Sequence, residues 1–398
     1  MRVLVVSEYY PRAADPTLGV WAHRQAVAAR DAGAEVRVLV LYRPLPGLSD
    51  VRSLRVRALR DAMRQPARDV RDGIAVEYLR YLSPPRPWSY ASWGAWAAPA
   101  LRRALARLHR EFSFDLAHAH YAVPAGDALR RAASRVPLLV SVHGGDVHGA
   151  HAAAPSVRAT LGHARLVLAN SAGTARRCEE RGARHTRVVH LGTDLPVPAA
   201  GAPGVPGVPG VPGDPEVPTL VTVGNLIARK RHADVIEAMA LLSERWPRLR
   251  YLVAGDGPER AALQALATAR GVADRVQWRG RLDHAEAVAV SRSGSLFVLP
   301  SVAEAFGVAY VEAMAGGVPA IGCRGEDGPE EIAGAGGGIE LVPARDPRAL
   351  AAAIDALLAS PQRLSSLSAA ARATVAAQFT WERCGRETVG AYEEVLRG

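Results

Sequence analysis

Short, continuously apolar runs alternate with helix-length segments along most of this chain of 398 residues. The first run, 3–6, is followed by a polar loop, by Gly19, by a helix predicted over 20–32 and by a second strand predicted over 35–41. Runs that are apolar at every position are typical of strands buried on both faces of a parallel sheet. The alternation predicts an α/β fold with doubly wound parallel sheets and right-handed crossovers. Further strands are predicted over 116–118, 138–142, 166–169, 220–223, 251–254, 276–278, 296–299 and 320–322.

A tract rich in proline and glycine, 196–218, interrupts this alternation. Such a composition cannot build a helix or an internal strand, so the tract predicts an extended or disordered linker. Its three Gly-Val-Pro triplets are far too few for a collagen helix. We therefore expect two Rossmann-like domains, 1–195 and 219–380, that face each other across a cleft, with a final helix over about 381–398 packed back on the first domain.

The balance of charges differs between the two halves of the sequence. Residues 1–200 hold 29 basic and 16 acidic side chains, whereas residues 201–398 hold 20 basic and 23 acidic ones. An excess of positive charge suits nucleic acid, an anionic membrane surface or phosphate-bearing substrates. The sequence has no zinc-ligand spacing, no stretch typical of RNA-binding strands and no basic tail, which argues against nucleic acid. The first half is therefore expected to face an anionic substrate or surface.

Cysteine usage and the first residues indicate the compartment. Cys178, Cys323 and Cys384 are odd in number and far apart, which is unlike a disulfide framework and fits a reducing cytosol. The apolar stretch before Ser7 and Glu8 is too short for the core of a signal peptide, and no apolar run approaches the roughly 20 residues of a membrane span. We expect a cytoplasmic protein that does not cross a bilayer.

The segment 296–322 carries the strongest chemical signals. A predicted strand ends, Glu304 follows in a loop, and Phe306 and Gly307 lead into a helix. Sheets of this class bind ligands at the carboxyl ends of their strands, and the free amides of a helix N-terminus suit a phosphate. Glu312 lies about one and a half turns into the helix, and carboxylates accept hydrogen bonds from sugar hydroxyls. The segment predicts a nucleotide-sugar pocket; the alternative is a loop charge and a helix-face charge in water.

Two further residues suit phosphate binding. Lys230 is the only lysine among 49 basic residues, and a compact ammonium binds phosphate well, although it can also be an ordinary surface cation. Gly19 lets the backbone approach a phosphate at the start of a helix, or simply forms the turn there. No G-x-G-x-x-G follows the opening strand, so the main signature of a dinucleotide site is missing.

The spacing of Glu304 and Glu312 within EAFGVAYVEAMAGGVP resembles the signature of the family 4 retaining glycosyltransferases, which have the two-domain GT-B fold. The segment VTVGNLIARKRH, 221–232, resembles that family's G-R-L-x-x-x-K-G loop and places Lys230 on the lysine that binds the donor pyrophosphate. Two positions depart from the loop, because Asn225 stands for its arginine and Arg231 for its final glycine. Arg229 or Arg231 is then the candidate for a second cation.

Other segments extend the resemblance over nearly the whole chain. VAGDGP, 253–258, is similar to a glycine turn near the donor, and VQWRGRL, 276–282, to the segment whose backbone contacts the nucleobase. HAHYA, VHGGD and VVHLGTDL resemble strand ends of the acceptor domain, and the opening SEYYP is similar to enzymes that build teichuronic-acid-type and other bacterial surface polysaccharides. The donor-binding residues implied are Gly19, Asn225, Arg229, Lys230, Gly257, Arg279, Glu304, Phe306, Gly307, Val308 and Glu312.

Two of the twelve histidines, His120 and His143, follow predicted buried strands and are therefore expected at the ligand-binding edge. The resemblance implies that His120 is an acceptor-side or sugar-contacting residue near the reacting carbon. His143 and Asp146 are assigned to the acceptor side, where Asp146 helps to position His143. For His143, a purely structural hydrogen bond to a loop is the open alternative.

An arginine-rich stretch precedes a cluster of tryptophans in the first half. If the stretch is helical, its arginines form one cationic stripe, although Pro66 would kink such a helix. Arginines with neighbouring aromatic residues can bind anionic lipid headgroups; the alternative is a solvated basic face beside packed aromatics. The residues concerned are Arg57, Arg60, Arg64, Arg68 and Arg71, followed by Trp88, Trp93 and Trp96.

These patterns predict a retaining glycosyltransferase that moves a sugar from a nucleoside diphosphate sugar to a glycan or lipid-linked acceptor. The implied catalytic residues are His120, Glu304 and Lys230. No D-x-D motif and no His/Cys cluster with ligand spacing is present, so we expect no cofactor and no metal. We expect a cytoplasmic enzyme, with the inner face of the membrane as a second location. Two alternatives remain: a nucleotide-sugar epimerase of the same fold, and a non-catalytic glycan- or lipid-surface-binding protein, because Asn225 departs from the donor motif.

Overall fold

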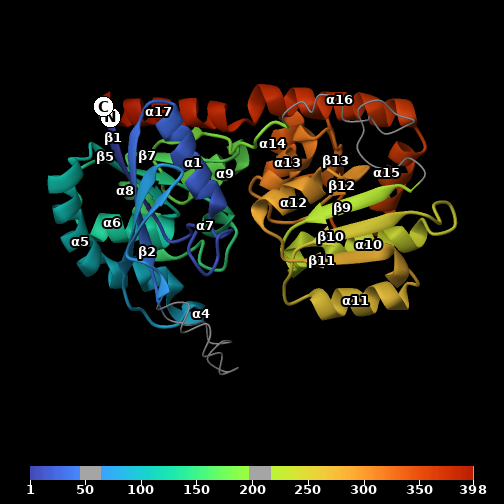
Figure 1. The fold of residues 1–398 in the computed structure, drawn as a ribbon, viewed down its shortest axis with the longest axis horizontal. Helices are drawn as coiled ribbons and strands as arrows, with labels where there is room; N and C mark the ends of the chain where they lie inside the picture. The colour runs from blue at the N-terminus through green and yellow to red at the C-terminus, as the bar shows by residue number, and fades with distance from the viewer. Residues whose placement is uncertain (45–63, 197–216, 398) are drawn as a thin grey trace. The chain divides into compact units, whose positions relative to one another are not determined.

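The computed structural model describes residues 1–44, 64–196 and 217–397. The chain forms two compact units (Figure 1). The first unit comprises residues 1–191 together with the C-terminal segment from Trp381, and the second comprises residues 192–380. Most of the predicted linker, 196–218, lies outside the described residues. Each unit is built on its own sheet, and each is described separately below.

The first unit contains an eight-stranded sheet in the order β3-β4-β2-β1-β5-β6-β7-β8. All neighbouring strands are parallel except β3, which pairs antiparallel with β4 at one edge. The strands are β1 (Arg2–Ser7), β2 (Glu35–Tyr42), β3 (Arg68–Arg71), β4 (Ile74–Arg80), β5 (Leu116–His120), β6 (Leu138–Ser141), β7 (Leu166–Ala169) and β8 (Thr186–Val188). The arginine-rich stretch is not helical at Arg68 and Arg71, where the chain forms an edge strand, so these two arginines do not belong to a helical cationic stripe.

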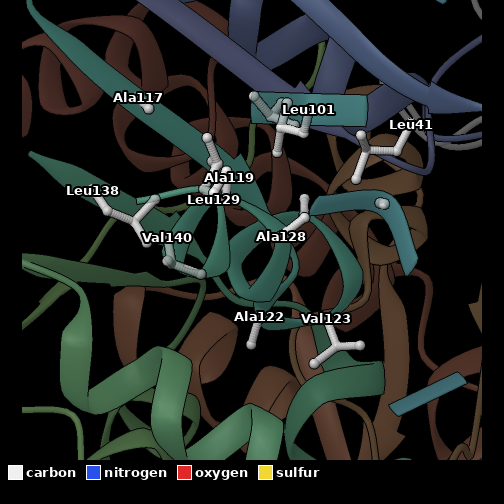
Figure 2. Packing of buried hydrophobic residues seen from close by; sticks show 14 of the residues in the cluster. Leu41, Leu101, Ala117, Ala119, Ala122, Val123, Ala128, Leu129, Leu138 and Val140 are labelled. Carbon is white, nitrogen blue, oxygen red and sulfur yellow. The ribbon is translucent and has the colours of Figure 1, made fainter. Parts of the chain in front are cut away.

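Both faces of this sheet are covered by helices. Alternate residues of β1 enter different core clusters, because successive side chains of a strand point to opposite faces. Leu4 and Val6 pack with α5 and α6, while Val3 and Val5 pack with α1 and α17. Figure 2 shows the first of these clusters, in which short side chains such as Ala119 allow close packing. The helices are α1 (Val20–Asp31), α4 (Arg86–Ser89), α5 (Trp93–Phe112), α6 (Asp127–Arg131), α7 (Gly144–Val147), α8 (Pro155–His163), α9 (Ala172–Glu180) and α17 (Trp381–Arg397).

The C-terminal helix α17 belongs to the first unit and lies against α1. Gly385 makes this close approach possible, since a Cβ at that position would lie 2.2 Å from the carbonyl oxygen of Ala28. Tyr392 is fully buried, and its hydroxyl lies 2.7 Å from Nδ1 of His118 on β5. The end of the chain is thus packed into the core that supports β1 and β5.

The second unit contains a six-stranded, fully parallel sheet in the order β11-β10-β9-β12-β13-β14. Its strands are β9 (Thr219–Val223), β10 (Arg250–Ala254), β11 (Val276–Gly280), β12 (Leu296–Val298), β13 (Ala320–Cys323) and β14 (Ile339–Val342). Its helices are α10 (His232–Leu241), α11 (Arg260–Ala269), α12 (His284–Ser291), α13 (Val308–Ala315), α14 (Asp327–Ala335), α15 (Pro347–Leu358) and α16 (Pro361–Gln378). Sequence signals define several helix starts: α15 and α16 each begin with proline after a capping side chain, Asp346 and Ser360. The predicted doubly wound α/β architecture is confirmed in both units.

Candidate functional site

The second sheet has its topological switch point between β9 and β12. From β9 the chain continues outward to β10 and β11 on one side, whereas β12 lies on the other side. The loops after two such strands diverge and leave a crevice at their carboxyl ends, where sheets of this kind bind ligands. The two loops touch, because the backbone amide of Val302 donates to the carbonyl oxygen of Arg229 over 2.8 Å. Lys230 and Glu304 are carried by these two loops.

Lys230 and Glu304 form an ion pair at this switch point. Nζ of Lys230 lies 2.5 Å from Oε2 of Glu304, and the same oxygen accepts a hydrogen bond of 2.9 Å from the hydroxyl of Ser301. Arg229 places a second cation 3.5 Å from that oxygen. The Lys230 and Glu304 side chains are only 12% and 9% exposed, so their charges interact in a poorly solvated place. The pair brings together two residues that lie 74 positions apart in the sequence.

The electrostatics keep Glu304 ionised. Burial alone would raise the pKa of Glu304, but the positive charges of Lys230 and Arg229 outweigh it and hold the pKa below its usual value. The backbone is fixed as well, since the amide of Glu304 donates to the carboxylate of Glu326 and its carbonyl accepts from the amide of Gly328. A preorganised carboxylate beside an ammonium can accept hydrogen bonds from hydroxyls while the cation binds an anion.

The two departures from the lysine loop have different structural consequences. Arg231 adopts a left-handed conformation with φ 56°, which explains why a glycine suits this position. Its guanidinium is bound by the carboxylate of Asp234 at 2.6 and 2.9 Å. Arg229, and not Arg231, is therefore the second cation next to Glu304. Asn225 is exposed, and its backbone carbonyl accepts from Nε2 of His232.

Two glycines permit close backbone approach around the same edge. Gly307 has φ 85° and precedes the first turn of α13, so that the free amides of that turn follow directly after Glu304 and its loop. A Cβ at Gly257, in the loop after β10, would lie 2.3 Å from the carbonyl oxygen of Leu226. The glycines are thus required by the packing of the loops, and they leave backbone amides near Val308 at the helix start.

Glu312, on α13, is the second carboxylate of the predicted pair. Burial raises the pKa of Glu312 to about 7, despite the opposing charge of Arg292. The carboxylate of Asp194 also raises this pKa. Arg292 is hydrogen-bonded to the backbone of Glu312, since its Nε donates to the Glu312 carbonyl oxygen over 3.0 Å. The guanidinium also donates, through a second nitrogen, to the backbone carbonyl oxygen of Asp194. Glu304 and Glu312 therefore differ in charge state near neutral pH.

The remaining predicted donor residues divide into two kinds. Arg279 is an exposed side chain on β11. Phe306 is only 2% exposed, and its ring packs edge-on against Phe379, 5.6 Å away. Position 306 can therefore contact a donor only through its backbone.

The first sheet has a corresponding switch point between β1 and β5. From β1 the chain continues to β2 on one side, while β5 lies on the other. Gly19 ends the loop after β1 with φ 63°, and a Cβ there would lie 2.1 Å from the carbonyl oxygen of Tyr9. His120 is the last residue of β5, and His143 follows the neighbouring strand β6. Both imidazoles are buried, and Nδ1 of His120 lies 3.2 Å from Nε2 of His143.

The histidines at this edge are neutral. Burial, together with the nearby imidazoles of His118 and His143, holds the pKa of His120 well below its usual value. Burial lowers the pKa of His143 to about 3. Within the described residues, Nε2 of His120 is buried without a hydrogen-bond partner. An unpaired ring nitrogen at a strand end can donate to or accept from a hydroxyl group.

Asp146 holds the two loops of this edge together. One carboxylate oxygen accepts from the backbone amide of His143 and the other from that of Ala122, each over 3.1 Å. Burial raises the pKa of Asp146 to about 7, although the backbone donors oppose the rise. Asp146 thus fixes the backbone of His143 rather than its ring.

Glu8, which follows β1 at this switch point, was not among the site residues predicted from the sequence. Glu8 is half-buried and its Oε2 accepts from the hydroxyl of Tyr90 over 3.2 Å. Burial raises the pKa of Glu8 to about 7, and the positive charge of Arg86 opposes the rise. Arg86 lies over the ring of Tyr90, 4.2 Å from its centroid. The available signal was a carboxylate directly after a buried strand, the same signal that identified Glu304.

Comparison with known proteins decides the class. Residues 211–374 match the family profile described as "Glycosyl transferases group 1", and residues 18–196 match that described as "Glycosyltransferase Family 4". The chain therefore belongs to the glycosyltransferases, with a family 4 domain followed by a group 1 domain. The family assignment and the GT-B fold predicted from the sequence are confirmed, and the protein is an enzyme of the glycosyltransferase class.

Two proteins similar in sequence and one similar in structure extend this comparison. The chain is 27% identical over 337 residues to a Bacillus subtilis protein named for teichuronic acid biosynthesis, a match that covers 81% of this chain and 80% of that protein. It is 28% identical over 304 residues to a GDP-mannose-dependent phosphatidylinositol monomannoside mannosyltransferase of Corynebacterium glutamicum, covering 72% and 78%. A crystal structure of the Anabaena protein HepE with UDP and glucose superimposes with a TM-score of 0.70 at 19% identity, covering 99% and 100%.

The residues predicted to contact lipid differ in their exposure. Trp88 and Trp96 are 76% and 52% exposed, but Trp93 is 3% exposed and packs in the core, so its assignment to the surface is wrong. Arg64 is exposed, and Arg68 lies on the edge strand β3. Arg57 and Arg60 lie outside the described residues. Among the described residues, no helix is both long and apolar enough to span a bilayer.

Proposed function

We propose that this enzyme is a retaining glycosyltransferase that uses a nucleoside diphosphate sugar as donor. The observation that carries the proposal is the contact between Lys230 and Glu304 at the switch point of the second sheet. A nucleoside diphosphate sugar needs both groups: a cation for its diphosphate and a hydrogen-bond acceptor for its sugar hydroxyls. The Anabaena protein of the same fold, which binds UDP and glucose, supports this donor class.

In this proposal, charge stabilisation is the main task of the second unit. The bond from the anomeric carbon to the diphosphate oxygen breaks, and negative charge grows on the leaving diphosphate. Lys230, with Arg229 and the amides that follow Gly307, stabilises that charge in a poorly solvated site. Glu304 accepts hydrogen bonds from the sugar hydroxyls, and Glu312 binds the ribose hydroxyls from α13.

In this proposal, the first unit binds the acceptor. His120 contacts the incoming hydroxyl through its unpaired Nε2, and Asp146 positions the neighbouring loop. The new bond joins the acceptor oxygen to the anomeric carbon on the face that the diphosphate leaves. The hydroxyl proton passes to an oxygen of the departing diphosphate, so the configuration of the anomeric carbon is retained. The mechanism requires no enzyme carboxylate as nucleophile.

The acceptor class follows from similarity and from the exposed aromatics. The Bacillus subtilis relative is named for a cell-surface polysaccharide and the Corynebacterium relative for a glycolipid. We propose a polysaccharide or lipid-linked glycan as acceptor, reached on the cytoplasmic side of the membrane. Trp88, Trp96 and Arg64 are the described residues that would contact an anionic bilayer.

A binding assay tests this membrane contact. Trp88→Ser with Trp96→Ser should lower cosedimentation with phosphatidylglycerol vesicles several-fold. The control exchanges two exposed leucines, Leu195→Ser with Leu241→Ser, which are 45% and 56% exposed. Equal binding by both double variants would remove the membrane surface from the proposal.

We also propose that catalysis needs no metal, because Lys230 and Arg229 already supply two positive charges beside Glu304. Transfer should then persist in EDTA and should not increase when Mg²⁺ or Mn²⁺ is added. A loss of transfer in EDTA that either cation restores would contradict this part of the proposal.

The central experiment is product analysis with UDP-, GDP- and ADP-sugars. Each donor is incubated with and without a lipid-linked glycan fraction, and products are identified by mass spectrometry and by NMR of the anomeric carbon. The proposal predicts a transferred sugar with the donor's anomeric configuration, and slow donor hydrolysis without acceptor. An epimerised nucleotide sugar would instead establish the epimerase alternative. Failure to bind UDP, GDP or ADP by calorimetry would favour a non-catalytic binding protein.

A further inference from the structure

A hollow of about 550 Å³ lies at the amino edge of the first sheet. It is lined by the segments 134–138, 162–165 and 184–185, which directly precede or begin β6, β7 and β8. These strands are parallel, so their beginnings share one edge of the sheet. His120 and His143 lie at the opposite edge, after the carboxyl ends of β5 and β6. The hollow therefore plays no part in the acceptor site proposed above.

The hollow is strongly basic. Arg135, Arg165 and Arg184 line it together with His163 and His185, and no carboxylate side chain is among its lining residues. All five side chains are exposed. Within the described residues, none of the three guanidinium groups has a hydrogen-bond or ion-pair partner. Concave surfaces lined by one sign of charge concentrate the field and attract the opposite charge.

Other arginines of the first unit do have acidic partners, in contrast to the three arginines of the hollow. Arg130 and Arg131 are both bound by the carboxylate of Asp127, each over 2.7 Å. Arg187, two residues after His185, is bound by Glu394 of α17 over 3.2 Å. Glu394, which directly precedes the lining residue Val395, is thus directed to another arginine. Three neighbouring guanidinium groups are left for an external anion.

The shape and the remaining lining indicate the size of that anion. The hollow is also lined by apolar side chains, among them Val136, Val395 and Leu396, the last two from the final turn of α17. A volume of this size is typical of small-molecule pockets, and guanidinium groups bind phosphate oxygens in pairs. We propose that the hollow binds a small polyanion of about nucleotide size that carries two or more phosphate groups.

The hollow is also connected to the acceptor edge through α17. Tyr392 lies one helical turn before Val395 and Leu396, and its hydroxyl contacts His118. The ring of His118 is stacked on that of His120, with centroids 4.7 Å apart. A polyanion that orders the last turn of α17 therefore also orders β5, where His118 and His120 lie.

Calorimetry with inorganic tripolyphosphate tests the site. Arg135→Gln/Arg165→Gln/Arg184→Gln should weaken binding at least tenfold. A matched triple variant, Arg103→Gln/Arg110→Gln/Arg176→Gln, removes the same charge from exposed arginines of the first unit and should change the affinity less than twofold. Lys230→Ala removes the donor-site cation and should leave this binding unchanged.

Two outcomes would contradict the proposal that the hollow binds a polyanion. Equal weakening in both triple variants would mean that tripolyphosphate senses only net charge, and loss in Lys230→Ala alone would place it in the donor site. The measurement needs no transfer assay, so its failure is distinct from a failure of the transferase proposal.

Hydrogen–deuterium exchange tests the coupling. Tripolyphosphate should slow exchange in peptides that cover 116–120, and Tyr392→Phe should abolish that change while tripolyphosphate binding persists. The triple variant of the hollow should show no change at all. Unaltered exchange in the wild-type protein at saturating tripolyphosphate would overturn the coupling through α17.

Discussion

The two switch points of this glycosyltransferase use the same topology for different chemistry. At the second sheet, Lys230 and Glu304 form a charged pair, whereas at the first sheet His120 and His143 form a neutral one. The difference lies in what surrounds each group. Burial is opposed by two cations around Glu304, but by no strong partner around the imidazoles. One switch point is therefore suited to a substrate that gains charge, and the other to a hydroxyl group.

The largest effect is expected from breaking the charged pair. Lys230→Ala and Glu304→Ala should each lower kcat by about a thousandfold, because each removes a group that stabilises the leaving diphosphate or holds the sugar. Lys230→Arg keeps the charge but not the compact ammonium, and should retain intermediate activity. The measurement is steady-state transfer, with thermal unfolding as a check on folding. Near-normal transfer by both alanine variants would remove the charged pair from the active site.

Substitutions in the neutral pair, His120 and His143, should lower kcat less than substitutions in the charged pair. His120→Ala should lower kcat by about a hundredfold, the usual scale for one positioned proton-transferring or hydrogen-bonding side chain. Because the pKa of His120 lies well below its usual value, the wild-type rate should show no fall near pH 6.5 that His120→Gln lacks; any change that both proteins share comes from other groups, such as Asp146 with its pKa of about 7. A pH profile of kcat, measured from pH 5.5 to 8 for wild type and His120→Gln, checks this. A wild-type fall near pH 6.5 that the variant lacks would contradict a neutral imidazole.

Some features of these sites could be predicted from the sequence and others could not, for physical reasons. Glu304 and Lys230 could be found because a strand end and a unique lysine are visible along the chain, and their contact follows from the parallel order of β9 and β12. The edge strand β3 could not be predicted, because the helical spacing of the arginines does not indicate antiparallel pairing with β4. Burial of Trp93 and Phe306 also depends on packing partners far away in sequence, such as Phe379. The role of Arg229 as second cation required the conformation of Arg231.

A smaller effect separates the two carboxylates of the second unit. The pKa of Glu312 is raised to about 7, so ionisation favours the unfolded chain: the stabilisation by its protonated form is complete below pH 4.5 and is lost as pH rises to about 7. Glu312→Gln should therefore gain stability relative to wild type between pH 5 and pH 8, by on the order of 2 kcal/mol. Thermal unfolding of both proteins at the two pH values measures this. The control, Glu244→Gln at an exposed position, should show no such difference. A constant Tm difference for Glu312→Gln would contradict the raised pKa.

The smallest effect is expected at Arg231, where this chain departs from the glycine of the family motif. Replacement by glycine should relieve the left-handed conformation, which costs a non-glycine residue about 1 kcal/mol, but it also removes the guanidinium that binds the carboxylate of Asp234, a side chain only 5% exposed. A buried carboxylate that loses its partner costs more than the relieved backbone gains, so Arg231→Gly should lower the free energy of unfolding by on the order of 1 kcal/mol. Transfer should be almost unaffected, because Arg229 supplies the second cation beside Glu304. Arg229→Gln serves as the comparison in the same assay and should raise the KM for the donor. If Arg231→Gly raised that KM instead while Arg229→Gln did not, the second cation of the charged switch point would have to be reassigned to Arg231.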